Sequence, residues 1–394
     1  SKAKYDLNAI LCYLTGMKII YPDSKRATYM DIDHIFGMDS SFNLQDIYLA
    51  LDEICNLRVK LQQHLQKEIV KIVKPDQSYV YLDITNTYFE KDFPEEGKLG
   101  QRGVSKDHRT EPIVQQGLLL DSNGMPLLHE CFPGNTSDSH MLQPMIKKVK
   151  EYHMTEGRMI VVADKGLNSG PNIDFLCNHG DGYVFSQVLK GKKGNRFHKR
   201  LFDESLYTVS KDGKYKWQLF EETFDGKDQN GKKIKRTRKV LLYWSAADAE
   251  VARKKREEKV KRAMKALTNN AYTTDHSKDR YLKLEMVDPQ SGEILQTKDG
   301  ILSLNQEQID RDALFDGYFC IITSEMDYDE KKIREVYHTL WMIENTFRLE
   351  KTDQGMRPIY VRTDDHIRAH FMIGHLATLI TRLIQHSLGE QLLS

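Results

Sequence analysis

Apolar residues recur with two different periods along this chain of 394 residues, and the change of period marks out its elements. Before Pro75 the apolar positions repeat every three or four residues, most clearly at Ile47, Leu51 and Ile54. This period is typical of helices that pack one face on a core. We therefore expect residues 1–76 to form a helical N-terminal region.

Strand-like segments begin at Ser78. Residues 78–89, 113–121 and 126–132 are rich in β-branched, aliphatic and aromatic residues, and the turn sequence SNGM joins the last two. Apolar segments separated by such turn signals predict an antiparallel meander of three strands.

Helices and strands then alternate. We expect a helix over residues 137–155, a buried strand over 159–163, a helix that begins near Ser169 and Pro171, and a strand over 183–189. This order of elements indicates an α/β fold with a mixed central sheet.

A polar and strongly charged stretch interrupts the alternation between residues 190 and 312. It contains short strands punctuated by glycine and one charged helix over residues 247–267. A strand over 318–324 and two long helices, over 328–352 and 364–388, complete the chain.

The interruption divides the chain into a core in two parts, residues 77–189 and 316–394, and a β-rich insertion over 190–315. Charge supports this division. The whole chain has 58 Lys and Arg against 57 Asp and Glu, a net charge of +1, whereas residues 190–265 hold 24 cations against 11 acids, a local charge of +13. The remainder therefore carries −12. This asymmetry is expected when one region binds nucleic acid and another holds cations.

Several classes of protein are disfavoured by the sequence. The five cysteines are scattered and form no C-x-x-C pair, which argues against a disulfide framework and a structural zinc site. The histidines show no H-E-x-x-H spacing. No apolar run approaches the length of about 18 residues that a membrane span needs, and no signal-peptide core is present. We expect a soluble, intracellular protein.

One carboxylate, Asp83, lies in the middle of the strand predicted over residues 78–89. A buried carboxylate without a partner is costly, so something must compensate its charge. One explanation is a hydrogen-bonded aspartate at a strand bend or edge. The other is a site that binds a cation.

A second carboxylate, Asp164, directly follows the predicted strand 159–163, at the edge of an α/β sheet where ligands bind. If Asp83 and Asp164 converge they repel each other, and divalent cations are the usual remedy. Two Mg²⁺ ions about 3.5 to 4 Å apart would stabilise the attacking and leaving oxygens of a phosphoryl displacement. Such a site needs a third carboxylate.

The helix predicted over residues 328–352 offers that carboxylate. Tyr337, Glu344 and Lys351 are spaced seven residues apart, so we expect them on one helical face, which Arg348 joins. The face is either a solvated ladder of salt bridges or the missing part of the site. Nearby carboxylates that compete with the chosen three are Asp92, Glu335 and Glu350.

Four segments together resemble a known family: YLDITNTYFE, GVSKDHRTEPIVQQGLLLDSNGMPLLHECFPGNTSD, VVADKGLNSG and YHTLWMIENTFRLEKTDQGMRPIYVRTDDHIRAHFMIGHLATLI. In this order they are similar to the DDE transposases of bacterial insertion sequences, over about residues 78–388. The resemblance implies an RNase H-like mixed sheet flanked by helices and interrupted by a β-rich insertion. It also implies that Asp83, Asp164 and Glu344 are the catalytic, metal-binding carboxylates.

The family's helix signature places Tyr, Arg, Glu and Lys at fixed spacing. Tyr337 and Lys351 match it on either side of the glutamate, and the resemblance implies that both contact DNA. The Arg position is Leu340, and Arg348 and Arg357 are the candidates to replace the phosphate contact of that Arg.

Further cations are expected to contact the DNA backbone. The loop SKDHR resembles a loop of the family and contains Lys106 and Arg109, although a solvated hairpin tip explains it equally well. The runs KGKKGNRFHKR and KKIKRTRK each hold six cations and no acid, which favours phosphate contacts. The residues chosen from these runs are Lys192, Lys193, Arg196, Arg236 and Arg238.

The resemblance thus implies a DNA transposase that cleaves transposon ends and joins the 3′-OH to target DNA, using two Mg²⁺ ions that Mn²⁺ replaces. It implies double-stranded DNA as partner, a homodimer in a synaptic complex, and a bacterial cytoplasmic location, on the nucleoid when bound to DNA. Two alternatives remain open: an RNase H-like nuclease that does not join, and a domesticated DNA-binding regulator. Charge alone also leaves RNA open as the partner of the basic part.

Overall fold

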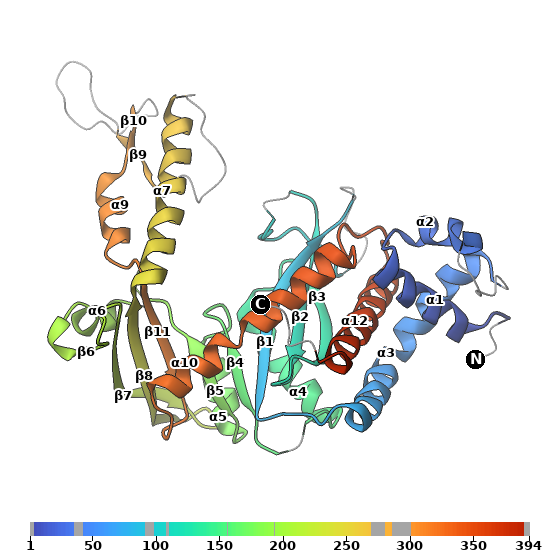
Figure 1. The fold of residues 1–394 in the computed structure, drawn as a ribbon, viewed down its shortest axis with the longest axis horizontal. Helices are drawn as coiled ribbons and strands as arrows, with labels where there is room; N and C mark the ends of the chain where they lie inside the picture. The colour runs from blue at the N-terminus through green and yellow to red at the C-terminus, as the bar shows by residue number, and fades with distance from the viewer. Residues whose placement is uncertain are drawn as a thin grey trace. The chain divides into compact units, whose positions relative to one another are not determined.

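The computed structural model describes residues 4–34, 42–90, 98–107, 110–155, 157–192, 194–268, 280–285 and 301–389 (Figure 1). The contacts of the chain group into two compact units. The first unit contains Ser1–Phe185, Thr223–Arg238 and Thr323–Ser394, and the second contains Ser186–Glu222 and Lys239–Ile322.

The N-terminal region is helical, as its apolar period predicts. Its elements are α1 (Leu7–Ile20), α2 (Lys25–Met30), the short 3-10 helix η1 (Ile32–His34) and α3 (Leu44–Ile72). Side chains of Asp6, Ser24 and Asn43 cap the α-helices by accepting hydrogen bonds from backbone N–H groups of the first turn. α1 and α3 pack on the C-terminal helix α12 (Asp364–Ser387). In the part of the chain that the structure describes, no helix combines the length and the apolar character that a membrane crossing requires.

The first unit contains a mixed sheet in the order β3-β2-β1-β4-β5. Its strands are β1 (Tyr79–Tyr88), β2 (Ile113–Leu120), β3 (Pro126–Pro133), β4 (Ile160–Ala163) and β5 (Gly182–Ser186). β1, β2 and β3 pair antiparallel, which confirms the predicted meander, whereas β4 runs parallel to both β1 and β5. All residues of β2 and β4 are buried, as expected for strands inside a sheet covered by helices.

Helices of the first unit pack on this sheet. The contacts are those of α4 (Leu142–Glu151) and α12 with β3, of α10 (Glu330–His338) with β4, and of α11 (Trp341–Arg348) with β1 and β2. α5 (Gly170–Asn178) begins at the N-cap Ser169 with Pro171 in its first turn, as predicted. The mixed α/β class expected from the order of the elements is therefore confirmed.

The helix predicted over residues 328–352 is broken into separate elements. α10 ends at His338, α11 begins at Trp341, and Leu349–Asp353 form a π-helical turn. The prediction of one continuous helix over residues 328–352 is therefore wrong, and the shared face of Tyr337, Glu344 and Lys351 stays a prediction.

Local hydrogen bonds explain the break. Thr339 Oγ1 donates to the backbone carbonyl of Glu335 at 3.0 Å, a contact that bends helices. The backbone N–H of Leu340 then bonds the carbonyl of Tyr337, three residues back, at 3.1 Å. This tighter, 3-10-type bonding changes the direction in which the following side chains point.

Four further strands follow in the order β11-β8-β7-β6, which are β11 (Tyr318–Thr323), β8 (Lys233–Ser245), β7 (Tyr215–Lys227) and β6 (Thr208–Val209). The second unit contains most of their residues, whereas the end of β7 and the start of β8 lie within Thr223–Arg238 of the first unit. β7 and β8 are 13 residues long, so the expectation of short strands is wrong here. The expectation of one charged helix is also too simple: α6 (Asn195–Leu201) and α9 (Gln306–Ala313) accompany α7 (Ala246–Thr268). The remaining strands, β9 (Leu282–Glu285) and β10 (Ile301–Leu304), pair antiparallel.

Candidate active site

The register of β1 and β4 brings Asp83 and Asp164 to the same level of the sheet. The two strands are parallel, and Leu82 is the partner of Ala163. Asp83 follows Leu82 in β1 and Asp164 follows Ala163 at the end of β4, so the two partly buried carboxylates leave adjacent strands side by side. Two acids placed in this way are the arrangement that a divalent cation relieves.

The environment of Asp83 opposes its ionisation. Burial raises the pKa of Asp83 to about 6, and the charges of Asp164 and Asp138 act in the same direction. The ammonium of Lys106 and the backbone N–H of Ile84 act in the opposite direction, and that N–H donates to Asp83 Oδ1 at 2.7 Å. A simple hydrogen-bonded aspartate would explain the contact with the N–H of Ile84. It would not explain why the carboxylates of Asp164 and Asp138 lie near Asp83.

Asp138 is a carboxylate of this region that sequence analysis does not single out. It begins the short 3-10 helix η2 (Asp138–His140), between β3 and α4. A Cβ added to Gly166 would lie 3.1 Å from Asp138 Oδ2, so this carboxylate lies against the turn that follows Asp164. The available signal is the polar sequence NTSDSH, residues 135–140, at the start of the predicted helix 137–155.

A buried amide holds the two turns together. The side chain of Asn172, 1% exposed, donates from Nδ2 to the carbonyl of Ser139 at 2.9 Å and to the carbonyl of Leu167 at 2.8 Å. Because one carbonyl belongs to the Asp138 turn and the other to the Asp164 turn, Asn172 fixes the position of each carboxylate relative to the other.

Tyr337 reaches the second aspartate. Its hydroxyl donates to Asp164 Oδ1 at 3.4 Å, from the last turn of α10, which packs on β4. The phenol is therefore at the site, although the helical face that led to its prediction is interrupted.

Glu344 lies on α11, the helix that packs on β1 and β2. Ile343 and Phe347 face the core, and Glu344 is exposed. Within the described ranges, no three His, Cys, Asp or Glu side chains form a ready-made group that would hold a metal ion. Two of the predicted carboxylates are thus juxtaposed by the sheet, and the role of the third stays a prediction.

Cations gather along the same strand. Lys351 Nζ donates to Thr85 Oγ1 at 2.6 Å, and Lys106 Nζ donates to the backbone carbonyl of Ile84. Thr85 is two residues beyond Asp83, so the two side chains share one face of β1. Burial lowers the pKa of Lys351, and the positive charges of Arg357 and Lys106 lower it further. A bound anion next to Lys351 would therefore be favourable, because it would offset the repulsion among these positive charges.

Arg357 belongs to this group through Asp107. Arg357 Nη1 pairs with Asp107 Oδ1 at 2.9 Å, and the charge of Asp107 acts on the pKa of Lys351 in the direction that raises it. Arg348, at the end of α11, is exposed. Arg109 lies outside the described residues.

The cations of the basic runs that were predicted to contact DNA differ in exposure and in their partners. Lys192 is exposed, and Lys193 lies outside the described residues. Arg196 stacks over the ring of Phe197 and lies 3.7 Å from Glu222.

Arg236 and Arg238 are engaged within the first unit. Arg236 pairs with Asp174 of α5 at 3.3 Å and bonds Asn178. Arg238 is 3% exposed, and its guanidinium lies 4.3 Å from the ring centre of Phe224. The structure thus gives both arginines a packing role that the charge pattern does not reveal.

The competing carboxylates differ from the chosen ones in their surroundings. Glu350 is buried, accepts a hydrogen bond from Thr378 of α12 at 3.4 Å, and has a pKa raised to about 7 by that burial. Glu335 is exposed and lies 3.6 Å from Lys332. Asp92 lies outside the described residues.

Comparison with protein families gives one match. The family described as "Transposase DDE domain" matches residues 82–380, a range that includes Asp83, Asp164 and Glu344. No curated protein matches the chain.

Solved structures show weaker similarity. A piggyBac transposase synaptic complex with hairpin DNA is 10% identical, with a TM-score of 0.46 over 98% of this chain and 67% of that chain. A Mos1 transposase paired-end complex with the left transposon end is 12% identical, with a TM-score of 0.20 over 46% and 59%. A Mos1 mariner paired-end complex with Mn is 12% identical, with a TM-score of 0.17 over 45% and 57%.

Proposed function

This chain belongs to the transposase DDE domain family, and from that premise we propose that Asp83, Asp164 and Glu344 are its three catalytic carboxylates. Family membership makes the protein a metal-dependent enzyme of phosphoryl transfer on DNA. The assignment of these residues rests on one observation: Asp83 in β1 and Asp164, directly after β4, lie at the same level of the sheet.

The residues around the pair fit divalent cations. Carboxylate oxygens are the ligands that Mg²⁺ and Mn²⁺ prefer. The charges of Asp164 and Asp138 oppose the ionisation of Asp83, and a bound cation would remove that opposition. The proposed cofactors are two Mg²⁺ ions, replaceable by Mn²⁺, which would neutralise charge on the reacting phosphoryl group. Glu344 joins the pair in the complex with DNA and cations.

The neighbouring side chains position the aspartates and the substrate. The Tyr337 hydroxyl holds Asp164, and Thr85 orients the ammonium of Lys351 on the Asp83 face of β1. Lys106, Lys351 and Arg357 then bind a DNA phosphate beside the carboxylates, which relieves the repulsion among these cations.

The proposed reaction has two steps of one kind. Water attacks a phosphodiester at the transposon end and leaves a 3′-OH, and that hydroxyl then attacks a phosphodiester of the target. Each step exchanges one P–O bond for another, so positioning and charge neutralisation suffice. Two ends must be held at once, so a homodimer on double-stranded DNA is part of the proposal, in the bacterial cytoplasm and on nucleoid DNA.

Strand transfer with pre-cut ends tests this function. Duplexes that carry an exposed 3′-OH at the terminal sequence are mixed with the protein, plasmid DNA and Mg²⁺, and joined products are expected. Asp83→Asn, Asp164→Asn and Glu344→Gln should each reduce joining by at least about 10³-fold, roughly 4 kcal/mol of activation free energy. The matched control is Glu335→Gln, an exposed glutamate of α10, which should join normally.

Other outcomes would favour the alternatives. Cleavage by the unaltered protein without any joined product would identify a nuclease. Sequence-specific DNA binding with no reaction in Mg²⁺ or Mn²⁺ would identify a regulator.

A further inference from the structure

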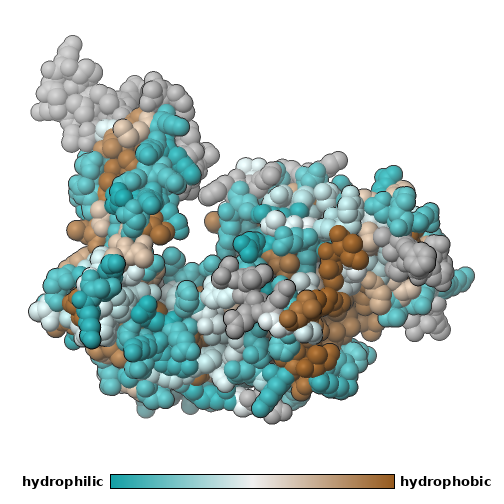
Figure 2. Space-filling view, viewed as in Figure 1, coloured by the Kyte–Doolittle hydropathy of each residue, from teal (hydrophilic) through white to brown (hydrophobic). Residues whose placement is uncertain are grey.

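The helix α7 of the second unit has one face that is mostly cationic in its C-terminal half. Between Lys254 and Lys265, at 100° per residue, an arc of about 160° holds six exposed cations and one exposed acid. The cations are Lys254, Lys255, Lys259, Lys261, Arg262 and Lys265, and the acid is Glu258. We call these seven residues the α7 face. Figure 2 shows hydrophilic side chains over this helix on the side that it displays.

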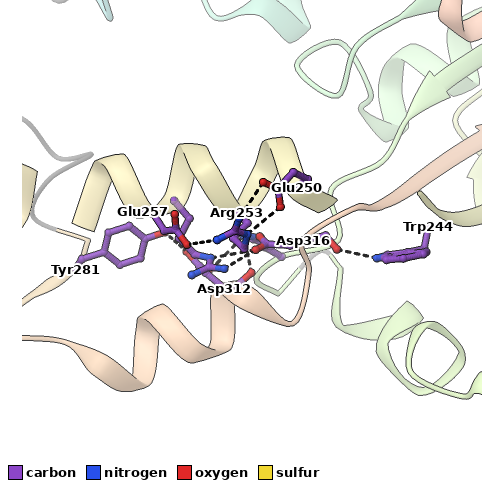
Figure 3. A network of polar contacts seen from close by, with 9 residues as sticks. Trp244, Glu250, Arg253, Glu257, Tyr281, Asp312 and Asp316 are labelled. Carbon is purple, nitrogen blue, oxygen red and sulfur yellow. Dashed lines mark hydrogen bonds and ion pairs between the residues drawn. The ribbon is translucent and has the colours of Figure 1, made fainter. Parts of the chain in front are cut away.

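The opposite side of α7 is fixed to its own unit. Ala263 is buried in a cluster with Tyr281 and Ile309. Arg256 pairs with Asp316 at 2.6 Å, and Figure 3 shows Asp316 beside the helix. These contacts set the rotation of α7 about its axis, so the α7 face stays exposed.

Within the part of the chain that the structure describes, the cations of the α7 face have almost no acidic partners. Among the described residues, Lys254 is the one member of the six cations that pairs with a carboxylate, that of Glu250 at 3.4 Å. Arg253, on the flank of the helix, is by contrast held by both Glu250 and Glu257 (Figure 3). Cations one helical turn apart repel each other and destabilise the helix. A bound polyanion removes this repulsion and is itself attracted by the same charges.

The types of side chain identify the chemistry of the partner. Lysines neutralise phosphates, whereas Asn, Gln and paired Arg side chains read base edges. The α7 face contains no Asn or Gln and a single Arg. From Lys254 to Lys265 the helix rises by about 17 Å, and duplex DNA presents roughly ten phosphate charges over that length.

We infer that the α7 face binds the phosphate backbone of double-stranded DNA without reading its sequence. That the polyanion is DNA rests on the proposed function. A surface of this kind suits target DNA, which differs in sequence from site to site, better than a defined transposon end.

Binding of the full chain to two unrelated duplexes of about 30 base pairs tests the inference. The measurement is made with EDTA present, over about 50 to 300 mM salt. The triple variant Lys255→Glu, Lys259→Glu, Arg262→Glu should lose at least about tenfold in affinity at 0.1 M salt, equally for both duplexes. The slope of log K against log salt should fall by about 2 to 3.

Two further variants make the result specific. Lys60→Glu, Lys67→Glu and Lys74→Glu change three exposed lysines of the first unit by the same total charge and should leave affinity within about twofold. Lys255→Arg, Lys259→Arg and Arg262→Lys keep the charge and should keep the affinity, which separates lost contacts from lost folding.

The inference is overturned if the control triple weakens binding as much as the α7 triple. It is also overturned if the loss appears with one duplex sequence alone, or is larger for duplex RNA than for DNA. Because EDTA prevents the reaction, this binding measurement does not depend on whether Asp83, Asp164 and Glu344 are the catalytic carboxylates. Loss of binding through the α7 face would likewise say nothing about the carboxylate assignment.

Discussion

Asp83 and Asp164 stand one residue beyond the paired residues Leu82 and Ala163 of two parallel strands. The sheet therefore forces two carboxylates to share one level, whatever the rest of the site does. The cost of this arrangement falls on Asp83, whose pKa burial and the neighbouring acids raise to about 6.

This cost makes the stability of the fold depend on pH. The pKa of an aspartate in an unfolded chain is about 3.9. Because the folded-state pKa is higher, the native state binds this proton more tightly, so ionised Asp83 destabilises the fold as pH rises from about 4 to about 6, and fully above that. Without divalent cations, Asp83→Asn should raise the free energy of unfolding at pH 7.5 by on the order of 1 to 3 kcal/mol, and by little at pH 4.

A second buried aspartate provides the control. Burial also raises the pKa of Asp121 to about 6, but its carboxylate accepts backbone N–H groups of Asn123 and Met125 in a turn. Addition of Mg²⁺ should raise the thermal unfolding temperature of the unaltered protein and of Asp121→Asn. It should raise that of Asp83→Asn markedly less. Equal stabilisation of the two variants would mean that the cation binds elsewhere.

Lys351 should act on the binding of DNA. Lys351→Met removes the ammonium beside Thr85 without adding charge, so the KM for a pre-cut end should rise by about tenfold while kcat changes less. Lys331→Met, an exposed lysine of α10, is the matched control. If the two variants have the same KM, Lys351 makes no contact with the substrate.

Arg238 should act on stability instead. Its guanidinium is buried over Phe224, so Arg238→Ala should lower the free energy of unfolding by about 2 kcal/mol, whereas Lys232→Ala at an exposed position should change it by less than about 0.5 kcal/mol. Chemical denaturation measures both values. A stable Arg238→Ala protein that binds DNA poorly would instead support the phosphate contact that the charge pattern predicts.

Asn172 should affect stability and reaction together. Asn172→Ala leaves the carbonyls of Ser139 and Leu167 without their donor, which should cost about 2 kcal/mol of stability and slow cleavage by loosening the Asp164 turn. Ser139→Ala keeps the backbone carbonyl that Asn172 binds, so it should behave as the unaltered protein in unfolding and cleavage assays. Cleavage at the normal rate by a destabilised Asn172→Ala protein would limit the amide to a structural role.

Local signals in the sequence were sufficient to place the two aspartates. Asp83 interrupts a run of strand-forming residues, and Asp164 ends an apolar run before a turn, so each position follows from a few neighbours. Their juxtaposition needed the strand order, which the family resemblance supplied.

Other features depend on contacts between distant segments. The break after α10 lies where the Thr339 hydroxyl donates to the backbone carbonyl of Glu335. Glu350 points into the core, where it accepts a hydrogen bond from Thr378 of α12. Neither contact is visible in a pattern of seven-residue spacing. In the sequence, Arg238 belongs to a run of cations that predicts phosphate contacts, and its packing on Phe224 cannot be seen there.

In the proposed mechanism, three carboxylates meet around shared cations when DNA is bound. Replacing those cations with Fe²⁺ in the DNA complex and mapping the hydroxyl-radical cuts in the protein chain tests it most directly. We expect cuts beside Asp83, Asp164 and Glu344 that excess Mg²⁺ suppresses together. Cuts beside the two aspartates with none at Glu344, or with the third at Glu350, would contradict it.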